Sequence, residues 1–228
     1  MHPSESRMKG GIVIGVLGGT GKEGSGLAFR WAVKGHEVII GSRSAENAAA
    51  AADELNRLLA GRGRVRGATN REAAHAASIV VLTVPYSAQA ATAEAVCDCL
   101  QGKILVDVTV PLSPPRVDRV QLPNGESAVL ALQRKLGERV NVVSAFQNVS
   151  ATHLKDLSRE IECDVLVCGD DTTARETVVG LARDAGLRAW HAGPLANSAA
   201  AEALTSVLIT INKRYKVPAS GIRITGVP

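Results

Sequence analysis

Short apolar runs alternate with amphipathic stretches along the whole of this 228-residue chain. The run Ile79-Val80-Val81-Leu82 has no polar position, which is typical of a strand buried on both faces of a parallel sheet. The alternation predicts a doubly wound α/β fold. We expect strands at Ile12–Leu17, Glu37–Gly41, Arg64–Gly67, Ile79–Thr83, Lys103–Val108, Asn141–Ala145, Asp164–Val167 and Arg188–Ala192. We expect helices at Lys22–Lys34, Ala45–Ala60, Arg71–Ala76, Ala88–Leu100, Ser127–Leu136, Ala151–Ser158, Thr173–Ala185 and Asn197–Arg214.

Two stretches interrupt this pattern. The segment Pro111–Pro123 contains four prolines, so we expect a loop after the fifth strand. The tail from Val217 to Pro228 contains two prolines and two glycines and is not expected to form a long helix. We place a domain boundary near Ser150, which divides the chain into residues 1–150 and a small C-terminal α/β lobe, residues 151–228.

Composition narrows the class of protein. Hydrophobic residues make up 46% of the chain and charged residues 21%, as in ordinary globular proteins. The net charge of +4 comes from interspersed charges, so we expect no nucleic-acid-binding face. Met1–Gly10 lacks the apolar segment of a signal peptide, and no apolar run is long enough for a membrane span, so we expect a cytoplasmic protein. The cysteines lack metal-ligand spacing and are interpreted as reduced thiols: Cys97, Cys99, Cys163 and Cys168.

The strongest motif follows the first expected strand and opens the first expected helix. There Gly19, Gly21 and Gly24 form the pattern G-x-G-x-x-G in the context that makes it informative. We expect Gly19 to permit a tight turn, Gly21 to let the backbone approach a pyrophosphate, and Gly24 to let the helix pack against the strand. The helix N-terminus would then hold the pyrophosphate of a dinucleotide. The alternative is a glycine-rich turn with a structural role only.

The end of the second strand distinguishes between the two nicotinamide dinucleotides. An NAD-binding chain would carry Asp or Glu there to hold the ribose 2′-hydroxyl. This chain has Gly41-Ser42-Arg43-Ser44, in which Ser42 and Arg43 offer hydrogen-bond donors to a 2′-phosphate. The sequence therefore predicts NADP, although these residues would also serve as solvated caps of the following helix.

Two further strand ends carry small residues followed by proline, in Thr83-Val84-Pro85 and Val108-Thr109-Val110-Pro111. Because ligands of open α/β sheets bind beyond the carboxyl ends of the strands, these residues are candidates to line the ribose and nicotinamide. The alternative is that each proline simply ends its strand.

No grouping of residues predicts a catalytic acid, base, nucleophile or metal ligand set. The histidines nearest the expected site are His153 and His191, and structural roles are the favoured interpretation of both. Asp170-Asp171 is interpreted as a helix N-cap, and Asp107 as a strand-end carboxylate that bonds nearby backbone. A site of this kind is compatible with hydride transfer between two cofactors, where the protein mainly holds two rings face to face.

Several blocks together resemble the NADPH-dependent coenzyme F420 reductases. They are Gly18–Ala28, Lys34–Val38, Gly41–Arg43, Thr83–Pro85, Val142–Phe146, Val167–Asp171 and Ala192–Ser198, which occur in the family's order from about Ile12 to Arg214. The resemblance implies an NADP-binding Rossmann-type domain with a small C-terminal lobe, a homodimer, and hydride transfer between NADP(H) and the deazaflavin coenzyme F420. It assigns Thr20, Lys22 and Glu23 to the phosphate loop and Ser42 and Arg43 to the 2′-phosphate. Beside the nicotinamide it puts Thr83, Val84, Pro85 and Ala151, whereas Val110 is a candidate from its place at a strand end. Beside the deazaflavin it puts Leu195, and Gln147 stands where the family has a residue close to that ring.

The block after Phe146 departs from this family. The family has a histidine close to the deazaflavin, whereas this chain has Gln147, which cannot carry a positive charge. Asn47 likewise stands where some members carry a base. The block around Gln147 is similar to the NADPH-binding parts of membrane ferric reductases, which pass hydride to a flavin. The alternatives are therefore an NADPH-dependent flavin or ferric reductase, or a non-catalytic NADPH-binding sensor.

Overall fold

The computed structural model describes residues 11–227, so the expectation about Met1–Gly10 falls outside the described residues. Eight strands form one sheet in the order β3-β2-β1-β4-β5-β6-β7-β8. All pairs are parallel except β6–β7, which is antiparallel. The predicted doubly wound α/β fold is thus confirmed, with one antiparallel pair. The strands are β1 Val13–Leu17, β2 Glu37–Ser42, β3 Val65–Thr69, β4 Ile79–Leu82, β5 Ile104–Asp107, β6 Asn141–Ser144, β7 Val165–Gly169 and β8 Ala189–His191.

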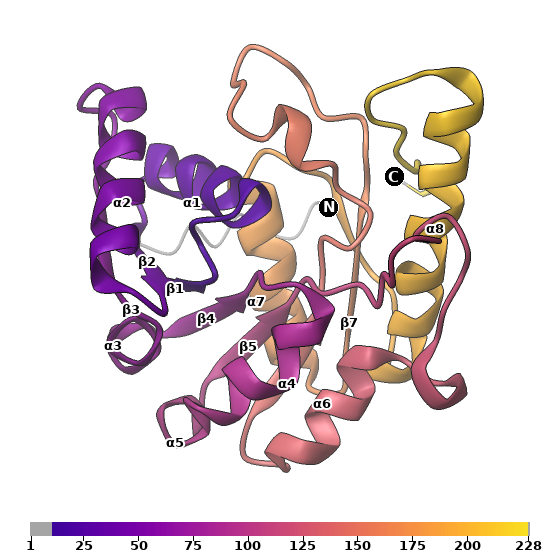
Figure 1. The fold of residues 1–228 in the computed structure, drawn as a ribbon, viewed down its shortest axis with the longest axis horizontal. Coiled ribbons are helices and arrows are strands. Elements are labelled where there is room, and N and C mark those ends of the chain that lie inside the picture. Colours follow the sequence, from indigo (N-terminus) through magenta and orange to yellow (C-terminus); the bar gives the residue numbers. More distant parts are fainter. Residues whose placement is uncertain (1–10, 228) are drawn as a thin grey trace, which may run out of the picture.

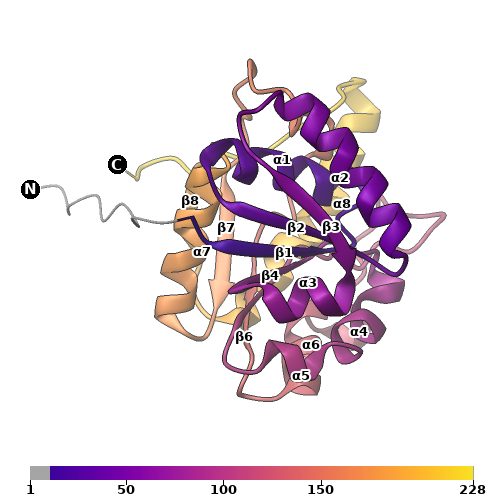
Figure 2. The same cartoon turned by 90° about the vertical axis from the view of Figure 1, so that its left-hand side faces the viewer.

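Helices cover both faces of the sheet (Figures 1 and 2), and the alternating side chains of each strand fill two cores. On β2, Val38 and Ile40 belong to the core on the face covered by α1 and α2, whereas Ile39 belongs to the core on the opposite face, beside α3. The helices are α1 Lys22–Lys34, α2 Ala45–Leu59, α3 Asn70–Ala76, α4 Tyr86–Glu94, α5 Cys97–Leu100, α6 Ala128–Leu136, α7 Thr172–Asp184 and α8 Ser198–Tyr215. Three short 3₁₀ helices are η1 Pro123–Gly125, η2 Ala151–His153 and η3 Leu195–Asn197.

Most predicted elements are found within two residues of their expected bounds, and α1 has the predicted bounds. The helix predicted over Ala88–Leu100 divides into α4 and α5. The helix predicted over Ala151–Ser158 is wrong, because only the turn η2 forms there. The carbonyl groups of His153, Leu154 and Asp156 instead accept hydrogen bonds from Arg30.

The sheet continues across Ser150, because β7 of the C-terminal segment pairs with β6. The division into two domains at this residue stays a prediction. The segment between β5 and η1 is irregular, as the prolines predicted. In the part of the chain that the structure describes, no helix has the length and apolarity needed to cross a membrane.

Candidate functional site

The loop between β1 and α1, residues 18–21, is called the glycine loop below. The N–H groups of Gly18 and Gly19 both donate to the carbonyl oxygen of Gly41 at the end of β2, at 3.1 and 3.2 Å. Gly18 has a φ of +75°, so the tight turn expected of Gly19 depends on its neighbour as well. A Cβ atom on Gly19 would lie 2.8 Å from the carbonyl oxygen of Val16. Neither position has room for a side chain.

Gly24 brings the start of α1 against the glycine loop and against Thr83, which follows β4. A Cβ atom on Gly24 would lie 2.4 Å from Oγ1 of Thr83 and 2.9 Å from Cα of Gly19. Thr83 is itself fixed, because its Oγ1 donates to the carbonyl oxygen of Leu17 at 2.9 Å. The close packing that the sequence predicted for Gly24 is therefore present.

The N-terminus of α1 is open. Gly21 is the N-cap, with φ −72° and ψ 166°, and no side chain caps the helix there. Among the described residues, the N–H groups of Lys22, Glu23 and Gly24 have no hydrogen-bond partner. Thr20 and Lys22 are exposed, while burial raises the pKa of the half-buried Glu23 to about 8. At neutral pH this helix end thus presents free donors without a negative charge, which favours an anion.

The end of β2 carries Ser42 and Arg43 beside the glycine loop. Ser42 is half-buried, and its Oγ accepts from the N–H of Ser44 at 3.3 Å. Ser44 itself caps α2 by accepting from the N–H of Asn47 at 3.2 Å. Arg43 is exposed and forms no salt bridge with any described residue. The capping role is therefore filled by Ser44, and the Arg43 guanidinium is available to an anion.

The ends of β4 and β5 lie next to the glycine loop, because both strands run parallel to β1 in the centre of the sheet. Val84 is half-buried, and its Cγ1 would touch a Cβ atom placed on Gly18. Pro85 is exposed as the N-cap of α4, so it also ends the strand. Val110 is half-buried after β5. The structure thus brings these predicted residues to the same edge of the sheet.

A buried polar group lies where β5 and β6 end. The Asp107 carboxylate is fully buried and accepts from Nε2 of Gln89 at 2.5 Å and from the N–H of Thr109 at 2.8 Å. Burial raises the pKa of Asp107, although these hydrogen bonds oppose the shift. Nε2 of Gln147 donates to the main-chain oxygen of Asp107 at 2.8 Å, which leaves Gln147 Oε1 buried without a partner among the described residues. Phe146, just before it, has a φ of +75°, a strained conformation for a bulky residue.

The two remaining predicted residues differ in accessibility. Ala151 is half-buried in η2, which packs against α1. Leu195 is fully buried in the core with Val129 and Leu132, so a bound ring would reach it only if η3 moved. Of the two histidines considered above, His191 pairs through its ring with Glu176 on the surface, whereas His153 contributes only its main-chain carbonyl group, which accepts from Arg30.

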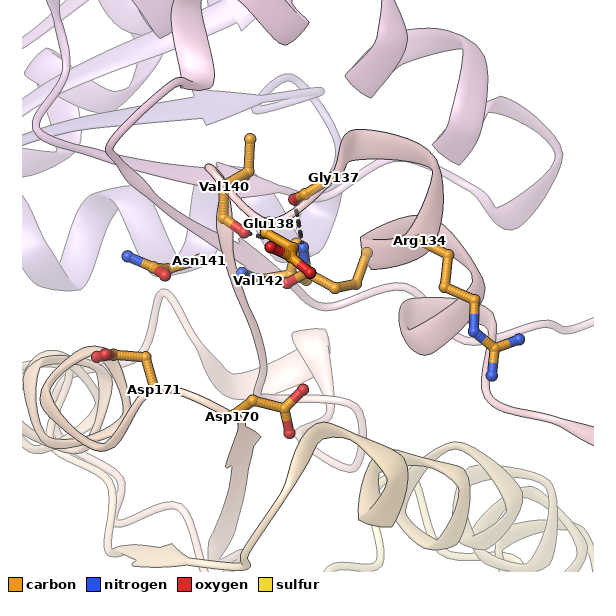
Figure 3. Close-up of a pocket in the computed structure, with 9 residues that line it drawn as sticks. Arg134, Gly137, Glu138, Val140, Asn141, Val142, Asp170 and Asp171 are labelled. Atoms are coloured by element: carbon orange, nitrogen blue, oxygen red, sulfur yellow. Dashed lines mark hydrogen bonds between the residues drawn. The ribbon is translucent and has the colours of Figure 1, made fainter.

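Two cavities of the described structure lie away from the glycine loop. A cavity of about 370 Å³ lies between the start of β6 and the start of α7, where Glu138, Asp170 and Asp171 contribute carboxylates. Figure 3 shows Asp170 and Asp171 pointing in different directions, and no described group of three such side chains is arranged to hold a metal ion. A second cavity, of about 280 Å³, lies between α4 and α6. None of the predicted site residues lines either cavity.

The sequence patterns did not identify two residues that are important for this edge of the sheet. Gly18 supplies the left-handed residue of the turn, and the Gly18-Gly19 pair was the available signal. Arg30 is buried within α1 and fixes the segment that carries Ala151. No sequence pattern marks it, because its partners lie far along the chain.

This chain is similar to known proteins over most of its length. A family model described as NADP oxidoreductase, coenzyme F420-dependent, matches residues 13–111. The F420-dependent NADP reductase of Methanothermobacter thermautotrophicus is 42% identical over 222 residues, which cover 94% of this chain and 95% of that protein. The rat metalloreductase STEAP3 is 30% identical over 205 residues, covering 90% of this chain and 38% of that protein.

A solved structure agrees with these sequence relatives. The crystal structure of a candidate F420-dependent NADP reductase from Arthrobacter sp. FB24 superimposes with a TM-score of 0.79 at 28% identity. The match covers 94% of this chain and all of that one. The likeness therefore extends beyond the glycine loop to the C-terminal segment.

Proposed function

This chain belongs to the F420-dependent NADP reductases, and we propose that its hydride transfer takes place at the edge of the sheet where β1, β2, β4 and β5 end. The enzyme is an oxidoreductase that transfers a hydride between NADP(H) and coenzyme F420. The observation that carries the location is the open N-terminus of α1, where three N–H groups have no partner among residues 11–227 and the glycine loop excludes side chains. Such an end is suited to a pyrophosphate.

Ser42 and Arg43 would hold the 2′-phosphate of NADP(H). Their position at the end of β2, next to the glycine loop, supports this assignment, as does the absence of a carboxylate at Gly41-Ser42-Arg43-Ser44. Arg43 has no salt bridge within residues 11–227 that would compete for its guanidinium. Asn47 is exposed one turn into α2 and would contribute an uncharged donor.

The nicotinamide would lie over the ends of β4 and β5, flanked by Thr83, Val84, Pro85, Val110 and Ala151. Within this arrangement the protein supplies position rather than acid–base chemistry. Hydride donor and acceptor carbons react when they are held about 3–3.5 Å apart. The two cofactors supply the electron chemistry, and the residues of this edge orient the rings.

Gln147 would act on the acceptor side. Its Oε1 is a buried acceptor without a protein partner in the described chain, and its Nε2 is already committed to Asp107. The amide orientation is thereby fixed, so the group is suited to accept a hydrogen bond from an N–H donor of a bound ring, or from a water. This residue also favours the second candidate function, a flavin or ferric reductase, because it replaces the family's histidine. The 30% identity to rat STEAP3 supports the same alternative.

We propose a homodimer formed through α8. Val207 and Tyr215 of this helix are 43% and 71% exposed, and the half-buried Leu204 and Ile211 continue the same stripe at helical spacing. A second copy would remove this apolar stripe from water. Sedimentation analysis should give a dimer for the wild type and a monomer for Val207→Glu, and a monomeric wild type would contradict the proposal.

The decisive experiment follows the visible absorbance of oxidised coenzyme F420 after NADPH is added. Enzyme-dependent bleaching supports coenzyme F420 as the hydride acceptor. Much weaker bleaching with NADH supports the role of Ser42 and Arg43 in the preference for NADPH. A parallel titration with flavin mononucleotide and ferric chelates tests the second candidate. NADPH binding without turnover on any acceptor would indicate the sensor and would overturn both enzymatic readings.

A further inference from the structure

Arg30 is a buried cation that connects α1 with two segments from much later in the chain. Only 7% of the residue is exposed. Its Nε donates to the carbonyl oxygen of Leu154 at 2.7 Å, and its Nη1 donates to that of Ala185 at 3.0 Å. Its Nη2 donates to the carbonyl oxygens of Asp156 at 3.0 Å and His153 at 3.4 Å. The guanidinium thus satisfies four carbonyl groups, and it forms no salt bridge with a described residue.

Gly26 forms the second part of the same contact. It precedes Arg30 by one helical turn, so both lie on the same face of α1. A Cβ atom on Gly26 would lie 2.5 Å from Cβ of Leu154, which is fully buried. Close packing at Gly26 and hydrogen bonds from Arg30 therefore hold the segment 150–156, called the Ala151 turn below, against α1.

The Ala151 turn is seated on the helix that begins at the glycine loop. Gly26 lies five residues after the N-cap Gly21, which is about 7 Å along the helix axis at 1.5 Å per residue. Within the Ala151 turn, Ser150 caps the short helix η2, and Ala151 is the first residue of η2. One helix therefore bears both the pyrophosphate end and the turn assigned to the nicotinamide.

We propose that Arg30, together with Gly26, is a positioning residue that sets the Ala151 turn against the nicotinamide ring of bound NADP(H). The inference rests on the proposed function of this edge. The adenosine half of the dinucleotide would contact the end of β2, and none of the four hydrogen bonds of Arg30 goes there. Loss of Arg30 should therefore disturb the nicotinamide half and spare the adenosine half.

The test compares Arg30→Lys and Arg30→Met with the wild type. A lysine supplies a point charge without the planar fork of donors, so it cannot replace the four hydrogen bonds. We expect unchanged affinity for 2′,5′-ADP, which probes the adenosine half alone. We also expect altered fluorescence of the bound nicotinamide of NADPH, and a fall of about 10- to 100-fold in kcat at saturating NADPH.

Two further variants separate positioning from general loss of stability. Gly26→Ala leaves Arg30 intact but displaces Leu154, so it should reproduce the altered fluorescence and lower kcat. Leu100→Ala removes a fully buried side chain of α5, on the other face of the sheet, and should lower Tm without changing either readout.

The proposal is overturned if Arg30→Lys and Gly26→Ala keep wild-type fluorescence and kcat. It is also overturned if 2′,5′-ADP affinity falls together with kcat in these variants. Should Arg30→Met fail to fold, Gly26→Ala still decides the question. A wild type that binds NADPH but does not reduce coenzyme F420 contradicts the proposed function alone, because the fluorescence comparison needs no acceptor.

Discussion

Replacement of Gly24 by alanine tests the arrangement of the phosphate-binding edge most directly. The new Cβ atom would lie 2.4 Å from Oγ1 of Thr83 and 2.9 Å from Cα of Gly19, whereas ordinary contact begins at 3.4 Å. Oγ1 of Thr83 is fixed by its hydrogen bond to Leu17, and the contact with Gly19 is to a backbone atom. Because neither contact can give way, α1 itself must move by about 1 Å. That shift would move the N–H groups at the start of α1 away from the proposed pyrophosphate position.

The loss of one charged hydrogen bond is worth about 1.5–3 kcal/mol. Since 1.4 kcal/mol is a factor of ten in affinity, the Kd for NADPH should rise about 10- to 100-fold in Gly24→Ala. Overpacking should also lower the free energy of unfolding by about 1–3 kcal/mol, partly offset by about 1 kcal/mol from the better helix propensity of alanine. Nicotinamide fluorescence measures the Kd, and denaturant unfolding measures the stability.

Gly180→Ala is the matched control, because this glycine also lies within a helix and a Cβ atom there would meet nothing within 4 Å. It should stabilise the protein by roughly 0.5–1 kcal/mol and leave the Kd unchanged. Adding Thr83→Ala to Gly24→Ala removes the 2.4 Å contact and should restore part of the affinity. If Gly24→Ala binds NADPH as tightly as the wild type, the close approach of α1 does not position the pyrophosphate.

The other predictions concern the charges of Arg43 and Glu23 and the contact of Gln147 with the hydride acceptor. Arg43→Ala should lower the preference for NADPH over NADH about 10- to 100-fold in kcat/KM, whereas Arg71→Ala, on an exposed pair with Asp98, should leave it unchanged. Burial holds the pKa of Glu23 at about 8, so the affinity for NADPH should fall as pH rises through that value and the carboxylate becomes negative. Glu23→Gln should flatten this pH profile of affinity. An unchanged profile in Glu23→Gln would refute the role of Glu23. The raised pKa also means that the folded state retains a proton that the unfolded state loses, so this contribution to stability is complete below about pH 4.5 and is lost as pH rises to about 8. Gln147→Leu should leave the Kd for NADPH within twofold of the wild type. Because the acceptor oxygen is lost, it should lower kcat with coenzyme F420 about tenfold, as measured by stopped-flow bleaching. Equal effects on the Kd and on kcat would contradict a role of Gln147 on the acceptor side.

Local signals were enough to predict most of the fold. The bounds of α1 follow from a glycine pattern at its start and Gly35 just after its end, where φ is +100°. Thr69 and Glu72, three residues apart, form a capping box at the start of α3. These features depend on residues a few positions apart, so the sequence carries them without reference to the rest of the molecule.

The helix expected over Ala151–Ser158 shows where local signals fail. Its residues are compatible with a helix, but Arg30 offers a buried guanidinium to three of their carbonyl groups from more than 120 positions earlier. The hydrogen bonds from the guanidinium to these three carbonyl groups replace those that a helix would have made within the segment. Helix propensity describes only the residues of the segment itself, so it does not predict that hydrogen bonds from Arg30 replace those of a helix.

The sequence by itself determined the alternation of strands and helices, the G-x-G-x-x-G pattern between β1 and α1, and the residues at the end of β2 on which the prediction of NADP rests. Each of these depends on periodicity or on spacing within about one element. Only the tertiary structure decided that Gly24 touches Thr83, that the Gln147 amide is fixed by Asp107, and that Arg30 seats the Ala151 turn. Those contacts join residues 40 or more positions apart, and they form only when the packed sheet brings their elements together.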